Sequence, residues 1–142
     1  MPDGSPRVIL VDDDRDVREL LRVVLGKVGV VCETAATGEE AVALIRGGPA
    51  DLLIIDKNLP GIDGLEAARR VRELQPGIRI ALVTGYDSEE ARQAAGDVGI
   101  DDYIRKPVDI DDFRRRVGAL LPAASPTGSA GGEGGARRPS FQ

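Results

Sequence analysis

The chain has 142 residues, of which 42% are hydrophobic and 30% are charged, a composition typical of one globular domain with a single core. No apolar run approaches the ~20 residues of a membrane span, and residues 1–6 lack the basic and apolar regions of a secretory signal. The net charge of −5 disfavours direct nucleic-acid binding, and because the chain contains no histidine, any histidine chemistry has to come from a partner.

The first half of the chain alternates short apolar runs with helical patterns. Arg7–Val11 predicts a strand, and apolar residues at helical spacing predict a helix over 15–28, which Gly29 ends. The apolar face of this helix consists of Val17, Leu20, Leu21, Val24, Leu25 and Val28. A second strand follows at Val30–Thr34, and a Thr-Gly-Glu-Glu capping box predicts a helix over 37–46.

The second half of the chain continues this alternation. The all-apolar run at 51–55 stops abruptly at Asp56, which predicts a strand buried on both faces of a parallel sheet. The remaining predicted elements are a helix over 65–74, a strand at 78–83, a helix capped by Asp87 or Ser88 that ends near Ala95, a strand at 101–105, and a helix that follows Asp109 and ends near Leu121.

Five strand–helix units in strict alternation predict the α/β class. We expect a five-stranded parallel sheet, doubly wound, with helices on both faces and right-handed crossovers. The second strand ends in residues without evident chemistry, which fits an outer position and the strand order 2-1-3-4-5.

Three segments of different composition make up the predicted domain organisation. Residues 1–6 are expected to form a disordered start, and residues 7–121 a folded body. Gly, Ala, Ser and Pro supply 15 of the 21 residues at 122–142, which predicts a flexible tail. We expect no output domain in these residues, although a fragment of a hybrid kinase or a larger regulator stays an alternative. The single cysteine, Cys32, excludes an internal disulfide, and together with the missing signal it favours a cytoplasmic protein.

Polar residues follow four of the predicted strands. Asp12 and Asp13 end the first, Asp56 the third, Thr84 the fourth and Lys106 the fifth. Because the carboxyl ends of parallel strands share one edge of the sheet, we expect these side chains to converge on one site.

The expected cluster of carboxylates favours a bound divalent cation. Carboxylates that lie together repel one another, and Mg²⁺ prefers one or two of them together with phosphate oxygens. An aspartate can act as a nucleophile towards a phosphoryl group, and a lysine can neutralise one phosphoryl oxygen. We therefore interpret Asp56 as a phosphoryl acceptor, with Lys106 beside it.

The pattern resembles the receiver domain of two-component response regulators and is similar to single-domain chemotaxis regulators. The matching motifs are Val11-Asp12-Asp13, Asp56 with Leu59-Pro60-Gly61 and Asp63-Gly64, Thr84-Gly85, and Tyr103-Ile104-Arg105-Lys106-Pro107. The resemblance implies a flavodoxin-like receiver fold over 7–121 and a signalling switch rather than an enzyme with a separate substrate. Such a switch catalyses only its own phosphorylation and dephosphorylation.

The resemblance also implies roles for the acidic residues. Asp56 would accept a phosphoryl group from a phosphohistidine on a sensor histidine kinase or a histidine phosphotransfer protein. Asp13 would bind Mg²⁺ directly and Asp12 mainly through water. Asp56 would be a further ligand, and the backbone carbonyl of Asn58 would complete the protein's share of the coordination.

The resemblance further implies a switch. The Thr84 hydroxyl would bond a phosphoryl oxygen, Tyr103 would rotate inward, and Lys106 would pair with the phosphoryl group, its bond to Pro107 being cis. The surface at 88–121 would change and reach an unknown output protein, the chain being a monomer or a phosphorylation-dependent dimer.

Three alternative functions remain to be weighed against the residues. Asp12 and Asp14 match the Asp-x-Asp pair of haloacid-dehalogenase-type phosphatases, in which Asp12 would be the nucleophile and Asp14 the acid/base. A degenerate receiver would bind partners without phosphorylation. A nucleotide-binding module is disfavoured, because aspartates follow the first strand in place of a glycine-rich phosphate loop.

Overall fold

The computed structural model describes residues 5–122, in which five strands alternate with five helices. In chain order the elements are β1 (Val8–Val11), α1 (Arg15–Lys27), β2 (Cys32–Ala35), α2 (Gly38–Arg46), β3 (Leu52–Asp56), α3 (Gly64–Leu74), β4 (Arg79–Thr84), α4 (Glu89–Val98), β5 (Asp102–Arg105) and α5 (Ile110–Leu120).

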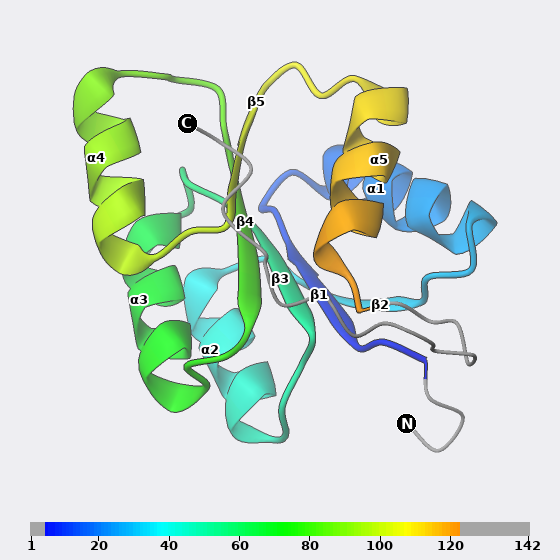
Figure 1. Cartoon of the computed structure of the whole chain (residues 1–142), viewed down its shortest axis with the longest axis horizontal. Helices are drawn as coiled ribbons and strands as arrows, with labels where there is room; N and C mark the ends of the chain where they lie inside the picture. Colours follow the sequence, from blue (N-terminus) through cyan, green and yellow to red (C-terminus); the bar gives the residue numbers. More distant parts are fainter. Residues whose placement is uncertain (1–4, 123–142) are drawn as a thin grey trace.

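The five strands form one parallel sheet in the order β2-β1-β3-β4-β5. Helices α2, α3 and α4 cover one face of the sheet, and α1 and α5 cover the other (Figure 1). The α/β class, the doubly wound architecture and the strand order predicted from the sequence are therefore confirmed.

The alternation of side chains along each strand divides the core into two layers. On β3, Leu53 and Ile55 pack against α2, α3 and α4, whereas Leu52 and Ile54 pack against α1 and α5. All four side chains are at most 1% exposed, and burial of each contributes about 1.5–3 kcal/mol. This double burial holds the end of β3, where Asp56 lies, in a rigid frame.

The helix N-termini follow the local signals in the sequence. The side chains of Asp14, Thr37, Asp63, Ser88 and Asp109 accept hydrogen bonds from backbone N–H groups in the first turns of their helices. The capping predicted at Thr37 is confirmed, Asp14 and Asp109 cap α1 and α5, and Ser88 rather than Asp87 caps α4. Asp87 is thereby free of a capping role and faces other groups.

Three details of the sequence prediction were wrong. Helix α4 continues three residues past Ala95, because Val98 is buried and Gly99 ends the helix in the left-handed conformation (φ 87°). Strand β2 begins at Cys32, two residues later than predicted. Leu20 and Val28 of the predicted apolar face of α1 are 52% and 51% exposed, so the buried stripe of that helix is narrower than the sequence suggested.

The predicted tail, apart from Pro122, lies outside the described residues, as do the first four residues of the predicted disordered start. Within 5–122, none of the helices combines the length and the apolar character that crossing a bilayer would require.

Candidate functional site

The end of β1 supplies two carboxylates. Asp12 is 3% exposed, and its Oδ1 accepts a hydrogen bond of 2.9 Å from the backbone N–H of Asp14. Arg18 on α1 donates a hydrogen bond of 2.7 Å to the Asp12 backbone carbonyl, which fixes the turn between strand and helix. Asp13, the next residue, is exposed, so one carboxylate is buried and its neighbour faces solvent.

The end of β3 places Asp56 next to Asp12, since β1 and β3 are neighbours in the sheet. Asp56 is 4% exposed, and its Oδ1 accepts a hydrogen bond of 2.9 Å from the backbone N–H of Asn58. The chain then turns back, and Gly64 donates its N–H to the Lys57 carbonyl at 2.8 Å. A Cβ atom on Gly64 would stand 2.1 Å from the Asp56 backbone oxygen, so glycine permits this close approach.

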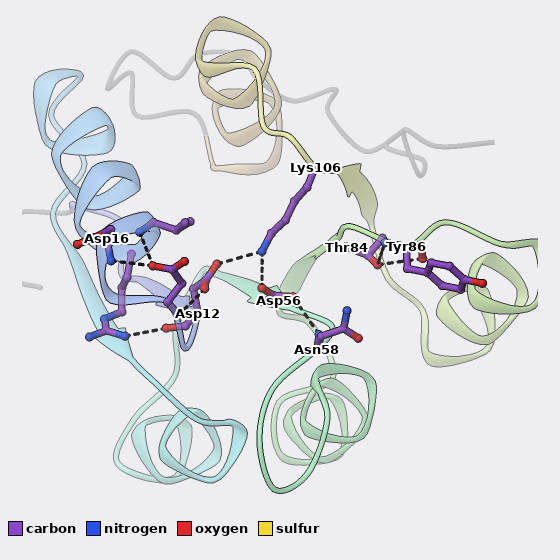
Figure 2. A network of polar contacts seen from close by, with 10 residues as sticks. Asp12, Asp16, Asp56, Asn58, Thr84, Tyr86 and Lys106 are labelled. Atoms are coloured by element: carbon purple, nitrogen blue, oxygen red, sulfur yellow. Dashed lines mark hydrogen bonds and ion pairs between the residues drawn. The ribbon is translucent and has the colours of Figure 1, made fainter.

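Lys106 follows β5 and extends over the carboxylates (Figure 2). Its Nζ lies 2.6 Å from Oδ2 of Asp56 and 3.6 Å from Oδ2 of Asp12. Burial lowers the pKa of Lys106, but the hydrogen bond to Asp56 and the charges of both aspartates outweigh it and raise the pKa above its usual value. The lysine is therefore a fixed positive charge at Asp56. The bond from Lys106 to Pro107 is cis.

The three aspartates form a cluster that could hold a metal ion. One carboxylate oxygen from each of Asp12, Asp13 and Asp56 lies within 4.8 Å of the others. The pKa of Asp12 is raised, first because the carboxyl is buried, while the Asp14 N–H and the Lys106 charge offset part of this effect. An all-oxygen donor set with this excess of negative charge suits Mg²⁺.

Thr84 lies at the same edge of the sheet, but its hydroxyl forms its hydrogen bonds with Tyr86 rather than with Asp56. Its hydroxyl accepts a hydrogen bond from the Tyr86 N–H and donates one to the Tyr86 carbonyl, both at 3.1 Å (Figure 2). Thr84 is fully buried, whereas Tyr86 is 74% exposed. The structure thus brings Asp12, Asp13, Asp56 and Lys106 together, and turns the Thr84 hydroxyl towards its own loop.

Sequence reasoning missed a group of charges beside Tyr103. Asp87, Arg92 and Arg105 come from the β4–α4 loop, α4 and β5, and they join in one set of ion pairs. The guanidinium carbon of Arg92 lies 5.1 Å from the centre of the Tyr103 ring. No sequence spacing links a loop, a helix and a strand in this way, so no motif could have predicted the group.

A family model described as the response regulator receiver domain matches residues 8–118. The chain belongs to this receiver family. As a receiver domain of two-component systems, it is a signalling module, which confirms the family identified from the sequence motifs.

Curated relatives share the receiver sequence over most of the chain. The response regulator MprA of Mycolicibacterium vanbaalenii is 39% identical over 125 residues, which make up 88% of this chain and 54% of that protein. The MprA of Mycobacterium sp. strain KMS is 40% identical over 120 residues, 84% of this chain and 52% of the relative. The chain therefore spans about half the length of the curated relatives it matches.

Solved receiver structures have the same fold. A CheY-like receiver domain protein from Methanospirillum hungatei aligns with a TM-score of 0.80 at 31% identity, over 87% of this chain and 99% of that one. The chemotaxis protein CheY4 of Vibrio cholerae aligns with a TM-score of 0.78 at 28% identity, over 82% of this chain and 99% of that one. The family's fold thus extends over almost the whole described body of this receiver.

Proposed function

We propose that this receiver accepts a phosphoryl group on Asp56 from a phosphohistidine of a sensor histidine kinase or a histidine phosphotransfer protein. The observation that carries the proposal is the pairing of Asp56 with Lys106 at 2.6 Å, beside two further carboxylates. Without histidine of its own, the chain depends on a partner for the phosphohistidine.

The geometry suits an aspartyl nucleophile. An oxygen of the Asp56 carboxylate would attack phosphorus, the bond from phosphorus to the partner's imidazole nitrogen would break, and the freed imidazole would take up a proton. Phosphoryl transfer needs mainly positioning and charge neutralisation. The Asn58 N–H orients the acceptor carboxylate, and Lys106 would pair with a phosphoryl oxygen.

Mg²⁺ is the cofactor that we propose for this site. Asp12, Asp13 and Asp56, with the backbone carbonyl of Asn58, would hold the ion, which supplies neutralisation of the negative charge that a phosphoryl group brings. Their all-oxygen chemistry and mutual proximity support this assignment.

The response would be a change in the surface formed by α4, β5 and α5. A phosphoryl group adds about −1.5 to −2 charges, and this charge would draw the Thr84 hydroxyl from Tyr86 towards Asp56. Tyr103, in the neighbouring strand, is the second proposed switch residue, and its ring is already turned inward in this structure. We propose residues 7–121 as the receiver unit. Its output would pass through a protein partner rather than nucleic acid. The receiver would act as a monomer or as a phosphorylation-dependent dimer. We propose that this reaction takes place in the cytoplasm, where a kinase would obtain its ATP.

Intact-mass spectrometry after incubation with a small-molecule phosphodonor tests the proposed function. We expect the gain of one phosphoryl group in the presence of Mg²⁺ and no gain when the metal is chelated, because the ion neutralises charge at the acceptor. A gain that is unaffected by chelation would contradict the role of Mg²⁺. No gain from either the small donor or a phosphorylated histidine phosphotransfer protein would indicate a degenerate receiver.

The substitution Asp13→Asn is expected to weaken Mg²⁺ binding at least ~10-fold, because it removes one charged ligand from the cluster. Isothermal titration calorimetry measures the affinity. Asp14→Asn is the matched control, since it removes the neighbouring exposed charge while asparagine still caps α1. Equal Mg²⁺ affinities in the two variants would show that Asp13 is not a ligand of the ion.

A further inference from the structure

Three charged side chains are joined by hydrogen bonds next to the switch. Arg92 donates two hydrogen bonds to the Asp87 carboxylate, at 2.9 and 3.0 Å, and Arg105 donates a third at 3.1 Å. These bonds, first of all those from Arg92, lower the pKa of Asp87 to about 2, so the carboxylate is charged at any physiological pH. We call Asp87, Arg92 and Arg105 the Asp87 bracket.

The Asp87 bracket covers Tyr103. Tyr103 is 4% exposed and packs in the core layer that includes Ala91 and Ala95 of α4. The Arg92 guanidinium carbon lies 5.1 Å from the ring centre, within the range of a cation–π contact. The pKa of Tyr103 is raised, first by burial and then because its hydroxyl lies beside the charged Asp87. The bracket therefore contacts the face of this ring through Arg92, and Asp87 lies near its hydroxyl.

The position of Tyr103 does not follow the position of Thr84. Tyr103 is turned inward, whereas the Thr84 hydroxyl is bonded at both its donor and its acceptor side to the backbone of Tyr86. Because the Thr84 hydroxyl already makes both of its hydrogen bonds within its own loop, it does not hold that loop towards Asp56. The inward ring is therefore held by contacts that do not involve Thr84, namely packing in the core layer and the polar groups of the bracket.

The Asp87 bracket also connects the β4–α4 loop to α4 and β5, two elements of the proposed output surface. Asp87 lies three residues after Thr84, and its partners belong to α4 and to the end of β5, next to Lys106. A single exposed ion pair has little effect on stability, but a carboxylate shared by two guanidinium groups forms a network with fixed geometry.

We propose that the Asp87 bracket holds Tyr103 in its inward position independently of Thr84, so that Asp87 and Arg92 are positioning residues of the switch. The proposal deepens the proposed function and rests on it in one respect, the role of Tyr103 as a switch residue. The consequence is that α4 and β5 present the inward-tyrosine surface before any phosphoryl transfer, and that this surface is lost when the bracket is broken.

Fluorine NMR of the chain labelled with 3-fluorotyrosine tests this proposal. The chain has two tyrosines, so two resonances are expected, and Tyr86→Phe assigns them. The solvent isotope shift between H₂O and D₂O measures exposure of each ring, and the exposed Tyr86 serves as the internal reference. The spectra are recorded without phosphodonor and without Mg²⁺, so the result does not depend on whether Asp56 accepts a phosphoryl group.

We expect a small isotope shift for Tyr103 in the unmodified chain and a larger one in Arg92→Ala. The outward population should rise roughly two- to fivefold, the factor that corresponds to loss of a partly exposed cation–π contact. Asp87→Asn removes the charge without removing side-chain volume and should act in the same direction. Arg92→Lys keeps the charge near Asp87 but loses the planar group that stacks on the ring, so its shift should lie in between.

Arg70→Ala is the matched control, because it removes an arginine from an ion pair with Glu66 on α3, away from Tyr103. The control should leave the Tyr103 shift unchanged. Two results would overturn the proposal: a Tyr103 shift as large as that of Tyr86 in the unmodified chain, or the same Tyr103 shift in Arg92→Ala, Asp87→Asn and Arg70→Ala.

Discussion

The Asp56→Asn protein is expected to take up no detectable phosphoryl group from a small-molecule donor in the presence of Mg²⁺. An amide is a poor nucleophile, and the carboxylate that it replaces is the group paired with Lys106 at 2.6 Å. Asparagine has the same size, and its carbonyl oxygen can still accept the Asn58 N–H, so the fold should persist. Intact-mass spectrometry compares the variant with the wild type, and circular dichroism verifies that both are folded.

Asp51→Asn is the matched control for this experiment. Asp51 lies next to the opposite end of β3, where its carboxylate accepts the Arg7 N–H at 2.7 Å, far from the acceptor edge. This variant should be phosphorylated like the wild type. Equal phosphoryl uptake in Asp56→Asn and the wild type would show that Asp56 is not the phosphoryl acceptor.

The substitution with the largest expected effect on stability is Gly64→Ala, directly beneath Asp56. The added Cβ would stand 2.1 Å from the Asp56 carbonyl oxygen and 2.8 Å from the Lys57 Cα, and both are backbone atoms that cannot rotate away. Relief requires a shift of the loop that follows β3, so we expect a loss of about 3 kcal/mol in the free energy of unfolding. Urea unfolding followed by circular dichroism measures this loss, which is a large part of a typical domain's stability.

Gly96→Ala is the control that separates the steric effect from backbone entropy. Gly96 lies within α4, where a Cβ would meet no atom within 4 Å. Alanine is the better helix former, so this variant should gain about 0.5–1 kcal/mol. If both substitutions change the free energy of unfolding by the same amount, the predicted steric clash of a Cβ atom at Gly64 does not destabilise the fold.

The sequence predicted the sheet and the position of the site because both depend on simple periodic signals. Apolar runs that end in Asp12, Asp56 and Lys106 predict strands whose polar ends share one edge, and the structure has these side chains within hydrogen-bonding or ion-pairing distance. The family assignment came from the same residues, and the family model confirms it.

The contacts made by individual side chains could not be predicted in this way. The bond of Thr84 to its own loop depends on backbone geometry after β4, and the extent of α4 depends on the burial of Val98 in an alanine-rich helix with a weak apolar pattern. The pairing of Asp87 with Arg92 and Arg105 joins three elements whose distances are set by the whole fold. Tertiary packing determines such details, and a single sequence carries no spacing rule for them.

The position of the phosphoryl group in the wild-type chain tests the central claim most directly. After incubation with phosphodonor and Mg²⁺, borohydride reduces an aspartyl phosphate to homoserine, and peptide mass spectrometry locates the converted residue. The proposed mechanism predicts conversion at Asp56. Conversion at Asp12 would contradict it and would favour a phosphatase-type site, in which Asp12 is the nucleophile and Asp14 the acid/base.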